Sequence, residues 1–250
     1  MRILNTRPSH QAGPLSHDIR VAGGISIELP ALQIEALALD WLDNLPDLSA
    51  IQKAIFVSTN AVDYFFKGLR FRHFILPNSI QIFAIGHGTA TQLKKYHILN
   101  CKIPPIADSE HLLALKELQE IKNHKVLLIS GEKGRPLIAS TLKERGAFLY
   151  QINTYRRCMP QKNFPFTRAL WQDDAVDIIL VLSQEAMMNL FDLFETAAKD
   201  WILSKPFVVI SQRLVACAHR YGIKTVIFSH YDDLLMTLTR LSHGTGRNAF

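Results

Sequence analysis

Short runs of apolar residues alternate along the chain with stretches in which apolar residues recur at helical spacing. The runs Lys125–Ser130, Asp177–Leu182 and Phe207–Ile210 are rich in β-branched and other apolar residues and predict buried strands. The stretches Pro136–Arg145 and Ala186–Thr196, which follow two of these runs, predict amphipathic helices. This alternation predicts an α/β protein in which helices cover both faces of parallel sheets.

The alternating pattern occurs twice in the sequence. An apolar run that starts at Ile55 ends at Ser58, and a similar run ends at Ser183, 125 residues later. A second pair of runs ends at Gly86 and Ser211 with the same separation of 125 residues. The repeat predicts two similar α/β units. Because small-molecule sites are common between domains, we expect a ligand to be held between these units.

Small polar residues stand where the expected strands turn into helices. Parallel sheets bind ligands at the carboxyl ends of their strands, and helix N-termini at these turns present N–H groups that attract anions. Binding of an anionic ligand is one interpretation, and the other is that small residues fit tight turns. The residues at these turns are Thr6, Arg7, Ser58, Gly86, Ser130, Gly131, Ser183 and Ser211.

The composition is that of an ordinary soluble protein and argues against some classes of partner. Of the 250 residues, 48% are hydrophobic and 20% are charged, with a net charge of +6. The basic residues are spread along the chain rather than gathered into a stripe, so we expect no nucleic-acid partner. No apolar run approaches the roughly 20 residues that cross a bilayer, and the chain starts without a signal-peptide core. We therefore expect a cytoplasmic protein with no membrane partner.

Motifs for cofactors and metals are incomplete in this sequence. Gly86-His87-Gly88 follows an expected strand, but Thr91 stands where a dinucleotide fingerprint requires glycine. Gly131–Arg135 lacks the Gly-Lys-Ser/Thr ending of a phosphate-binding loop. No histidine pair has metal-binding spacing, and the three cysteines are far apart. We therefore expect neither a cofactor nor a metal ion.

Further short motifs follow one another along the chain. They are Asn5-Thr6-Arg7-Pro8 with Gln11-Ala12, Val57–Val62, Phe83–Gly86 with Thr89-Ala90, Asp108–Leu113, Gly131 with Gly134-Arg135, Arg145-Gly146-Ala147, Tyr155-Arg156-Arg157 and Ile210–Leu214 with Ala218. Each motif is weak alone, but their order and spacing from residue 2 to about 241 resemble the uroporphyrinogen-III synthase family. Ser211-Gln212-Arg213 departs from the Gly-Pro-Thr-Thr of other members, so Arg213 is the expected substitute there.

The resemblance implies two doubly wound, flavodoxin-like domains with parallel sheets, joined by a two-stranded connector. The domains would comprise residues 1–30 with 173–250, and residues 38–150, with connectors at 31–37 and 151–172. The extended parts of the connectors would pair as an antiparallel ladder. From the residues alone, Cys158–Asp174 is expected to be a linker because it contains Pro160 and Pro165. The tail 242–250 has no assigned role.

The resemblance also implies a reaction. Members of the family convert hydroxymethylbilane, a linear tetrapyrrole with eight carboxylates, to uroporphyrinogen III with loss of water and inversion of the last pyrrole ring. This cyclisation belongs to heme biosynthesis, needs no cofactor and is carried out by a monomer. Tyr155 is the implied proton donor to the leaving hydroxyl, and the alternative is that it only packs on the connector. The implied substrate-binding residues are Arg7, Ser58, Asn60, Gly86, Thr89, Gly131, Arg135, Ser183, Ser211 and Arg213.

Two other functions are compatible with parts of the sequence. A non-catalytic, hinged two-lobe module that binds a small anionic ligand explains the repeat equally well, but it does not require Tyr155 in the connector. A nucleotide-dependent enzyme of doubly wound fold is disfavoured by the incomplete glycine motifs. Arg156 and Arg157 either attract the substrate or line the linker, and for Arg157 we expect the linker role.

Overall fold

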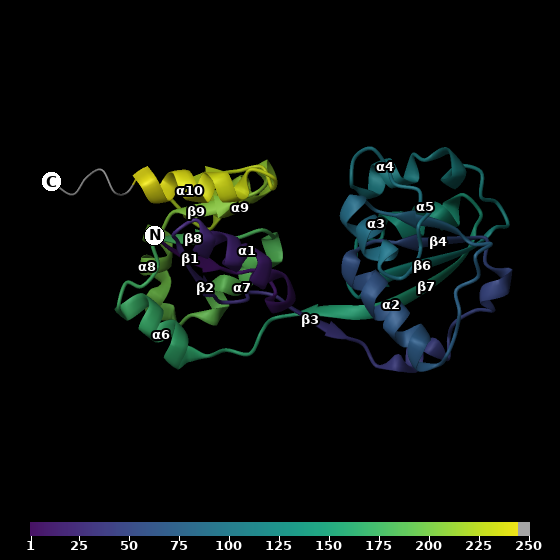
Figure 1. Ribbon diagram of the computed structural model, residues 1–250, viewed down its shortest axis with the longest axis horizontal. Helices are drawn as coiled ribbons and strands as arrows, with labels where there is room; N and C mark the ends of the chain where they lie inside the picture. Colours follow the sequence, from purple (N-terminus) through teal and green to yellow (C-terminus); the bar gives the residue numbers. More distant parts are fainter. Residues whose placement is uncertain (245–250) are drawn as a thin grey trace. The chain divides into compact units, whose positions relative to one another are not determined.

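The computed structural model describes residues 1–244, which form two compact units (Figure 1). Unit 1 consists of Met1–Gln33 and of the chain from Cys158 onward, and unit 2 consists of Ile34–Arg157. The chain therefore passes from one unit to the other twice. Of the tail 242–250, helix α10 includes the residues up to Gly244, and the rest lies outside the described residues.

Unit 1 is built on a five-stranded parallel sheet with the order β2-β1-β8-β9-β10. Its strands are β1 (Arg2–Asn5), β2 (Ile25–Glu28), β8 (Ile178–Leu180), β9 (Phe207–Val209) and β10 (Val226–Phe228). Its helices are α1 (Ser9–Val21), α6 (Phe164–Gln172), α7 (Gln184–Leu193), α8 (Lys199–Ser204), α9 (Gln212–Arg220) and α10 (Leu234–Gly244), with the 3-10 turn η4 (Thr196–Ala198). Counted along unit 1, this order is the flavodoxin-like 2-1-3-4-5.

Hydrophobic residues cover both faces of the sheet of unit 1, because successive side chains of a strand point to opposite faces. Ile3 belongs to the cluster that includes α1 and α10. Its neighbour Leu4 belongs to the cluster that includes α6, α7, α8 and α9. This two-sided burial explains why the inner strands β8 and β9 are continuously apolar rather than alternating.

Unit 2 contains a five-stranded sheet with the order β3-β7-β6-β4-β5. Its strands are β3 (Gln33–Ala36), β4 (Lys53–Phe56), β5 (Gln81–Ala84), β6 (Lys125–Gly131) and β7 (Phe148–Cys158), of which β3 begins and β7 ends at the boundary with unit 1. Its helices are α2 (Thr59–Phe71), α3 (His87–Lys94), α4 (Ser109–Leu113) and α5 (Leu137–Glu144), with the 3-10 turns η1 (Leu39–Leu42), η2 (Leu48–Ala50) and η3 (Lys116–Leu118). The helices α2 and α3 pack on one face and α4 and α5 on the other.

Strand β3 is the exception to the parallel arrangement of unit 2. The Leu37 N–H donates to the Thr154 carbonyl over 3.1 Å, and Arg156 hydrogen-bonds to Glu35. Because the residue numbers increase along β3 while those of its partners in β7 decrease, the two strands run antiparallel. An antiparallel edge strand on an otherwise parallel sheet is common in α/β folds.

The repeat read from the sequence is confirmed by the sheet topology. Strands β2, β1, β8 and β9 follow one another in unit 1 as β7, β6, β4 and β5 do in unit 2. Ser58 and Ser183, which the repeat placed at equivalent positions, each cap the helix after the equivalent strand. The prediction of two doubly wound α/β units is therefore correct.

The linker predicted at Cys158–Asp174 is wrong for its second half. Residues 164–172 of this segment form helix α6. The Asn163 side chain accepts a hydrogen bond from the Phe166 N–H over 3.2 Å, and Pro165 lies in the first turn. Proline is tolerated at this point because the first N–H groups of a helix have no partner within it. The segment 151–158, also expected as connector, is part of β7.

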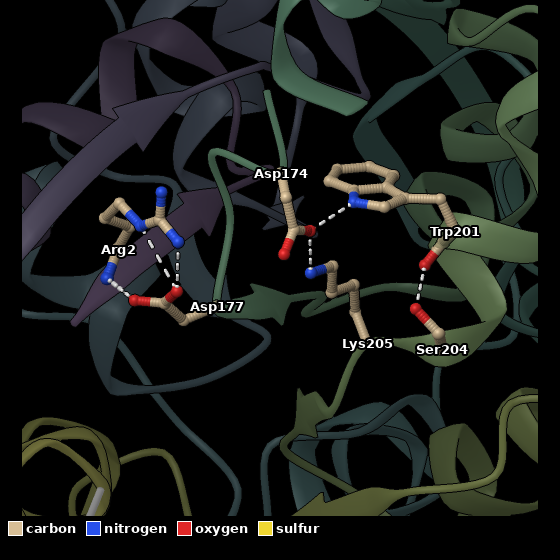
Figure 2. A network of polar contacts seen from close by, with 6 residues as sticks. All are labelled: Arg2, Asp174, Asp177, Trp201, Ser204 and Lys205. Carbon is tan, nitrogen blue, oxygen red and sulfur yellow. Dashed lines mark hydrogen bonds and ion pairs between the residues drawn. The ribbon is translucent and has the colours of Figure 1, made fainter. Parts of the chain in front are cut away.

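A network of charged and polar side chains lies at the amino edge of the sheet of unit 1, where β1 and β8 begin (Figure 2). The Asp177 carboxylate accepts hydrogen bonds from the Arg2 guanidinium and backbone N–H, both at 2.6 Å. Asp174 accepts from Lys205 and, over 2.7 Å, from the Trp201 indole. These contacts tie the starts of two strands and helix α8 together at the edge opposite the strand-to-helix turns.

Candidate functional site

Most of the predicted site residues lie at the carboxyl edge of the sheet of unit 2, where its strands end. Ser58 follows β4, Gly86 follows β5, Gly131 ends β6 and Tyr155 lies in the second half of β7. Because β4, β5, β6 and β7 are parallel, their carboxyl ends meet at one edge. The predicted residues of unit 2 are Ser58, Asn60, Gly86, Thr89, Gly131, Arg135 and Tyr155.

Ser58 makes two contacts at this edge. It is the N-cap of α2, and its Oγ accepts a hydrogen bond from the Ala61 N–H over 3.0 Å. The same oxygen lies 3.0 Å from the Tyr155 Oη. A serine cap explains why the helix begins here, since it satisfies an N–H group that has no partner inside the helix. The contact with the phenol is an additional role that capping does not need.

The Tyr155 ring occupies space that Gly131 leaves open. Gly131 is paired with Tyr155 across β6 and β7, after an irregularity in register between Ser130 and Gly131. A Cβ atom at Gly131 would lie 2.6 Å from the Tyr155 Cζ, so any side chain there would displace the ring. The ring also stacks with Tyr64, at 6.1 Å between centroids. Tyr155 is consequently only 3% exposed.

A cavity of about 260 Å³ adjoins Tyr155 at the carboxyl edge. Its lining residues are Val57, Ile85, Ser109, Leu128, Ser130, Gly131, Glu132, Lys133, Gly134, Arg135, Ile138, Gln151, Tyr155 and Arg157. Its volume is below the roughly 300–1,000 Å³ of a complete small-molecule site, so it has room for only one part of a large ligand. Apolar side chains and the phenol stand beside three cationic side chains, a combination that suits a ring bearing carboxylates.

Two cationic residues of this cavity were not predicted. Lys133 lies in the loop after β6, and Arg157 lies two residues beyond Tyr155 in β7. Residues two apart in a strand share a face, so the spacing of Tyr155 and Arg157 was the signal that could have assigned Arg157 to the cavity. The expectation that Arg157 lines a linker is therefore replaced by a position in the lining of this cavity. For Lys133 no comparable signal exists in the sequence.

The predicted carboxylate ligand Arg135 already has an acidic partner. Its guanidinium donates to the Glu110 carboxylate over 2.7 Å, and both side chains are more than half exposed. This hydrogen bond lowers the pKa of Glu110 below its ordinary value. The pair is open to solvent and hence weak, so an incoming carboxylate can replace Glu110.

The other predicted residues of unit 2 lie in the turns and helices that follow β4 and β5, and none of them lines this cavity. Gly86 precedes α3, and a Cβ atom there would lie 2.6 Å from the Ala107 side chain. Thr89 is buried in α3, and Asn60 is partly exposed in the first turn of α2. For Gly86, close packing is a sufficient reason for glycine. The roles given to these three residues stay predictions.

The remaining predicted residues lie in unit 1. Ser183 caps α7 and Ser211 caps α9, where their Oγ atoms accept from backbone N–H groups at 3.1 and 3.3 Å. Arg213 is exposed in the first turn of α9. The Arg7 guanidinium stacks over the Tyr231 ring, 5.7 Å from its centroid. These residues share the carboxyl edge of the sheet of unit 1.

A larger open cavity, of about 740 Å³, lies elsewhere in unit 1. It is lined by residues at the carboxyl ends of α7 and α9, among them Phe191, Phe194, Arg220 and Tyr221. Ser183 and Ser211 cap the opposite ends of these helices, so none of the predicted residues lines this cavity. We place the candidate site at the carboxyl edge of unit 2, where the phenol and the cations meet.

The described residues contain no group of histidine, cysteine and acidic side chains arranged to hold a metal ion. None of the described helices is both long enough and apolar enough to span a membrane.

Comparisons with known proteins agree on one family. The family model described as "Uroporphyrinogen-III synthase HemD" matches residues 13–234. The uroporphyrinogen-III synthase of Escherichia coli K12 is 30% identical over 249 residues, which cover 95% of this chain and 100% of that protein. That of Proteus mirabilis is 35% identical over 160 residues, covering 63% of this chain and 80% of that protein.

Solved structures are similar over nearly the whole chain. A mutant uroporphyrinogen III synthase from the extremely thermophilic bacterium Thermus thermophilus has a TM-score of 0.67 at 16% identity and covers 99% of this chain and 100% of its own. The uroporphyrinogen-III synthetase of Helicobacter pylori 26695 has a TM-score of 0.61 at 17% identity, covering 97% of this chain and 98% of its own. At these identities the similarity shows the fold.

Proposed function

The chain belongs to the uroporphyrinogen-III synthase family, and we propose that it closes hydroxymethylbilane to uroporphyrinogen III with loss of water and inversion of the last pyrrole ring. The observation that carries the proposal is the Tyr155 phenol, which lies against Ser58 beside a cavity lined by Lys133, Arg135 and Arg157. This arrangement combines a proton donor with cations for a substrate rich in carboxylates.

Tyr155 is proposed as the acid of the first step. The bond between the hydroxymethyl carbon and its oxygen breaks, the electron pair leaves with the oxygen, and the phenol supplies the proton that turns hydroxide into water. The lone pair of the adjacent pyrrole nitrogen stabilises the resulting cation, so modest acid assistance is sufficient. A phenol with a pKa near 10 is an effective donor at neutral pH because it is protonated there. Ring closure finally releases a proton from a pyrrole carbon, which restores the phenol.

The acetate and propionate arms of the substrate need positive partners that also hold its conformation. Lys133, Arg135 and Arg157 surround the cavity, and guanidinium groups bind carboxylates through two parallel hydrogen bonds. The N-terminus of α2, a helix of 13 residues, presents further N–H groups at the same edge. Holding one conformation matters because spontaneous closure yields the isomer without inversion. We propose Asn60, Gly86, Thr89 and Gly131 as parts of this surface, and Arg7, Ser183, Ser211 and Arg213 as substrate contacts of unit 1.

We further propose that the protein acts in the cytoplasm as a monomer, without a metal, cofactor or nucleic-acid partner. Cys101 and Cys217 are free thiols, which fits a reducing compartment. Sedimentation velocity tests the monomer, and activity after dialysis against a chelator tests independence from metal ions.

The test of the reaction is a coupled assay. Hydroxymethylbilane is generated enzymatically and mixed with the purified protein, and the oxidised products are separated into type I and type III uroporphyrin. We expect type III to dominate, and type I to dominate when the protein is omitted. Type I alone, formed at the spontaneous rate by folded protein, would contradict the proposal and favour the non-catalytic module that binds a small anion.

A further inference from the structure

We propose that Ser58 is a positioning residue for Tyr155, which it orients so that the phenolic proton points into the cavity. The inference rests on the proposed function, because it names the group that aligns the proposed acid. It goes beyond the family resemblance, which assigns Ser58 only to substrate binding. The contact between the Ser58 and Tyr155 hydroxyl groups leads to it.

The Ser58 hydroxyl has one hydrogen to donate and two lone pairs. The Ala61 N–H occupies one lone pair, and the Tyr155 oxygen lies at hydrogen-bond distance, 3.0 Å. Within residues 1–244 the structure records no other acceptor for the Ser58 hydrogen. In either direction of this bond, one of the two hydroxyl hydrogens has no recorded acceptor among the described residues. With Ser58 donating to the phenol oxygen, that hydrogen is the phenolic one, which remains available for the substrate. We propose this direction because an acid cannot transfer a proton that it already donates to Ser58.

This direction also stabilises the charge that develops on the phenol. When Tyr155 gives up its proton, its oxygen becomes negative, and a donated hydrogen bond to an oxyanion is stronger than one to a neutral oxygen. Ser58 is the N-cap of a helix of 13 residues, so the phenol oxygen lies near the positive end of the helix dipole. The cap therefore lowers the cost of proton transfer as well as fixing the orientation.

The equivalent serines of the two units show that the contact with Tyr155 is distinct from helix capping. Ser183 occupies the position of Ser58 in unit 1 and caps α7 in the same way. Among the described residues, Ser183 has no recorded hydrogen bond to a phenol, whereas Ser58 does. A serine at this turn is thus explained by the helix alone, and the contact with Tyr155 is what distinguishes unit 2.

The experiment is a double-mutant cycle with four variants: Ser58→Gly, Ser58→Thr, Tyr155→Phe and the double variant Ser58→Gly/Tyr155→Phe. Glycine removes the hydroxyl but is tolerated at an N-cap, so α2 is retained, and threonine keeps both hydroxyl and cap. Asn163→Ala is the matched control, because it removes the side-chain cap of α6, a helix of unit 1 that contains none of the proposed site residues. Circular dichroism and urea midpoints establish that each variant is folded.

We expect Tyr155→Phe to lower kcat for type III formation about a hundredfold, the low end of general acid catalysis. Ser58→Gly should lower kcat about tenfold, with KM changed less than about threefold, because one hydrogen bond to the developing oxyanion is lost. The double variant should be no slower than Tyr155→Phe, since the hydroxyl acts only through the phenol. Ser58→Thr should retain kcat within about threefold, and Asn163→Ala should match the wild type.

Several results would overturn the inference. Losses that multiply in the double variant, an unchanged kcat in Ser58→Gly, or a change confined to KM would each show that Ser58 does not act through Tyr155. A wild-type protein that forms only type I would remove the proposed function and this inference with it. An active wild type whose two losses multiply would remove the inference alone, so the two failures are distinguishable.

Discussion

The two units have the same strand order but use the carboxyl edge of the sheet differently. In unit 1, Thr6 follows β1, is 1% exposed and donates its hydroxyl hydrogen to the Leu180 carbonyl over 2.6 Å. The equivalent strand of unit 2, β6, ends instead at Gly131. There the missing side chain admits the Tyr155 ring, and a cavity opens beside it. After β1, unit 1 thus has a buried hydrogen bond, whereas a cavity adjoins the end of β6 in unit 2.

The two units also differ in the polar side chains close to these strand ends. In unit 1 the fully buried Asn5 donates to the Ser16 hydroxyl over 3.1 Å, and Ser16 lies 2.9 Å from the Ser26 hydroxyl. In unit 2 the hydroxyls of Ser58 and Tyr155 meet beside the cavity instead. Polar groups that satisfy one another stabilise a fold, whereas groups beside a cavity can exchange partners with a ligand. The same fold thus has a buried polar network near β1 in unit 1 and two hydroxyls beside a cavity in unit 2.

The largest expected effect comes from removing buried hydrogen bonds in unit 1. Asn5→Ala removes the bonds to Ser16 and to the Arg7 N–H and leaves buried partners unsatisfied, so we expect the free energy of unfolding to fall by about 3 kcal/mol. Urea unfolding, with hydrogen exchange to locate the loss in unit 1, measures it. His17→Ala, on the exposed face of α1, is the control and should change stability by less than about 0.5 kcal/mol. Equal stability of the two variants would mean that the Asn5 network contributes nothing.

The next largest effect comes from filling the space beside Tyr155 in unit 2. Gly131→Ala places a methyl group 2.6 Å from the Tyr155 ring, and we expect overpacking to cost about 2 kcal/mol of stability. The displaced phenol should also lower type III formation about tenfold, because general acid catalysis depends on position. The stability control is Gly134→Ala, whose added carbon would meet only an oxygen at 3.5 Å. A Gly131→Ala protein as stable and active as the wild type would show that Tyr155 needs no such room.

The sequence predicted the features that depend on local pattern. The serine caps were visible because Ser58 and Ser183 each end an apolar run, and the repeat located equivalent strands. Helix α6 was missed because Pro165 was taken as a break, although proline suits the first turn of a helix. The buried bonds of Asn5 could not be predicted, because its partner Ser16 is brought to it only when α1 packs on the sheet.

The site was predictable only in part for the same reason. Tyr155 came from the family resemblance, and nothing in its local sequence indicates that it pairs with Ser58, 97 residues away. The pairing of Gly131 with Tyr155 depends on the irregular register between Ser130 and Gly131, which a pattern of apolar residues does not reveal. The alternation of side chains along a strand could have assigned Arg157 to the cavity, but the sequence analysis assigned this residue to a linker.

A smaller effect compares the two helix caps directly. Loss of a serine cap costs about 1 kcal/mol, so Ser183→Ala should lower the stability of unit 1 by that amount. Ser58→Ala should cost about 1 kcal/mol more, because the buried Tyr155 hydroxyl also loses its recorded partner. Hydrogen exchange of the Ala61 and Ala186 amides, which the caps bind, reports each loss separately. Equal losses would show that the phenol contributes nothing to the stability of unit 2.

The smallest effect concerns the amino edge of unit 1, where Asp177 binds Arg2 (Figure 2). Burial raises the pKa of Asp177, but the hydrogen bonds from Arg2 outweigh it and hold the pKa below its ordinary value. A carboxylate with a lowered folded-state pKa stabilises the fold above its unfolded pKa of about 3.9, and the contribution disappears as the pH falls through the folded value. Since both side chains are more than a third exposed, solvent screening limits the contribution to about 0.5 kcal/mol.

Asp177→Asn should therefore be less stable than the wild type at pH 7, and the difference should shrink as the pH falls below about 4. Urea midpoints of both proteins from about pH 7 to about pH 2.5 measure this, and salt at about 1 M should reduce the difference at neutral pH. Glu110→Gln is the matched control in unit 2, because the Glu110–Arg135 pair is more exposed than the pair of Asp177 and Arg2. A larger effect at Glu110 would reverse the comparison, since it would mean that the open edge of unit 2 depends on its charges for folding as well as for binding.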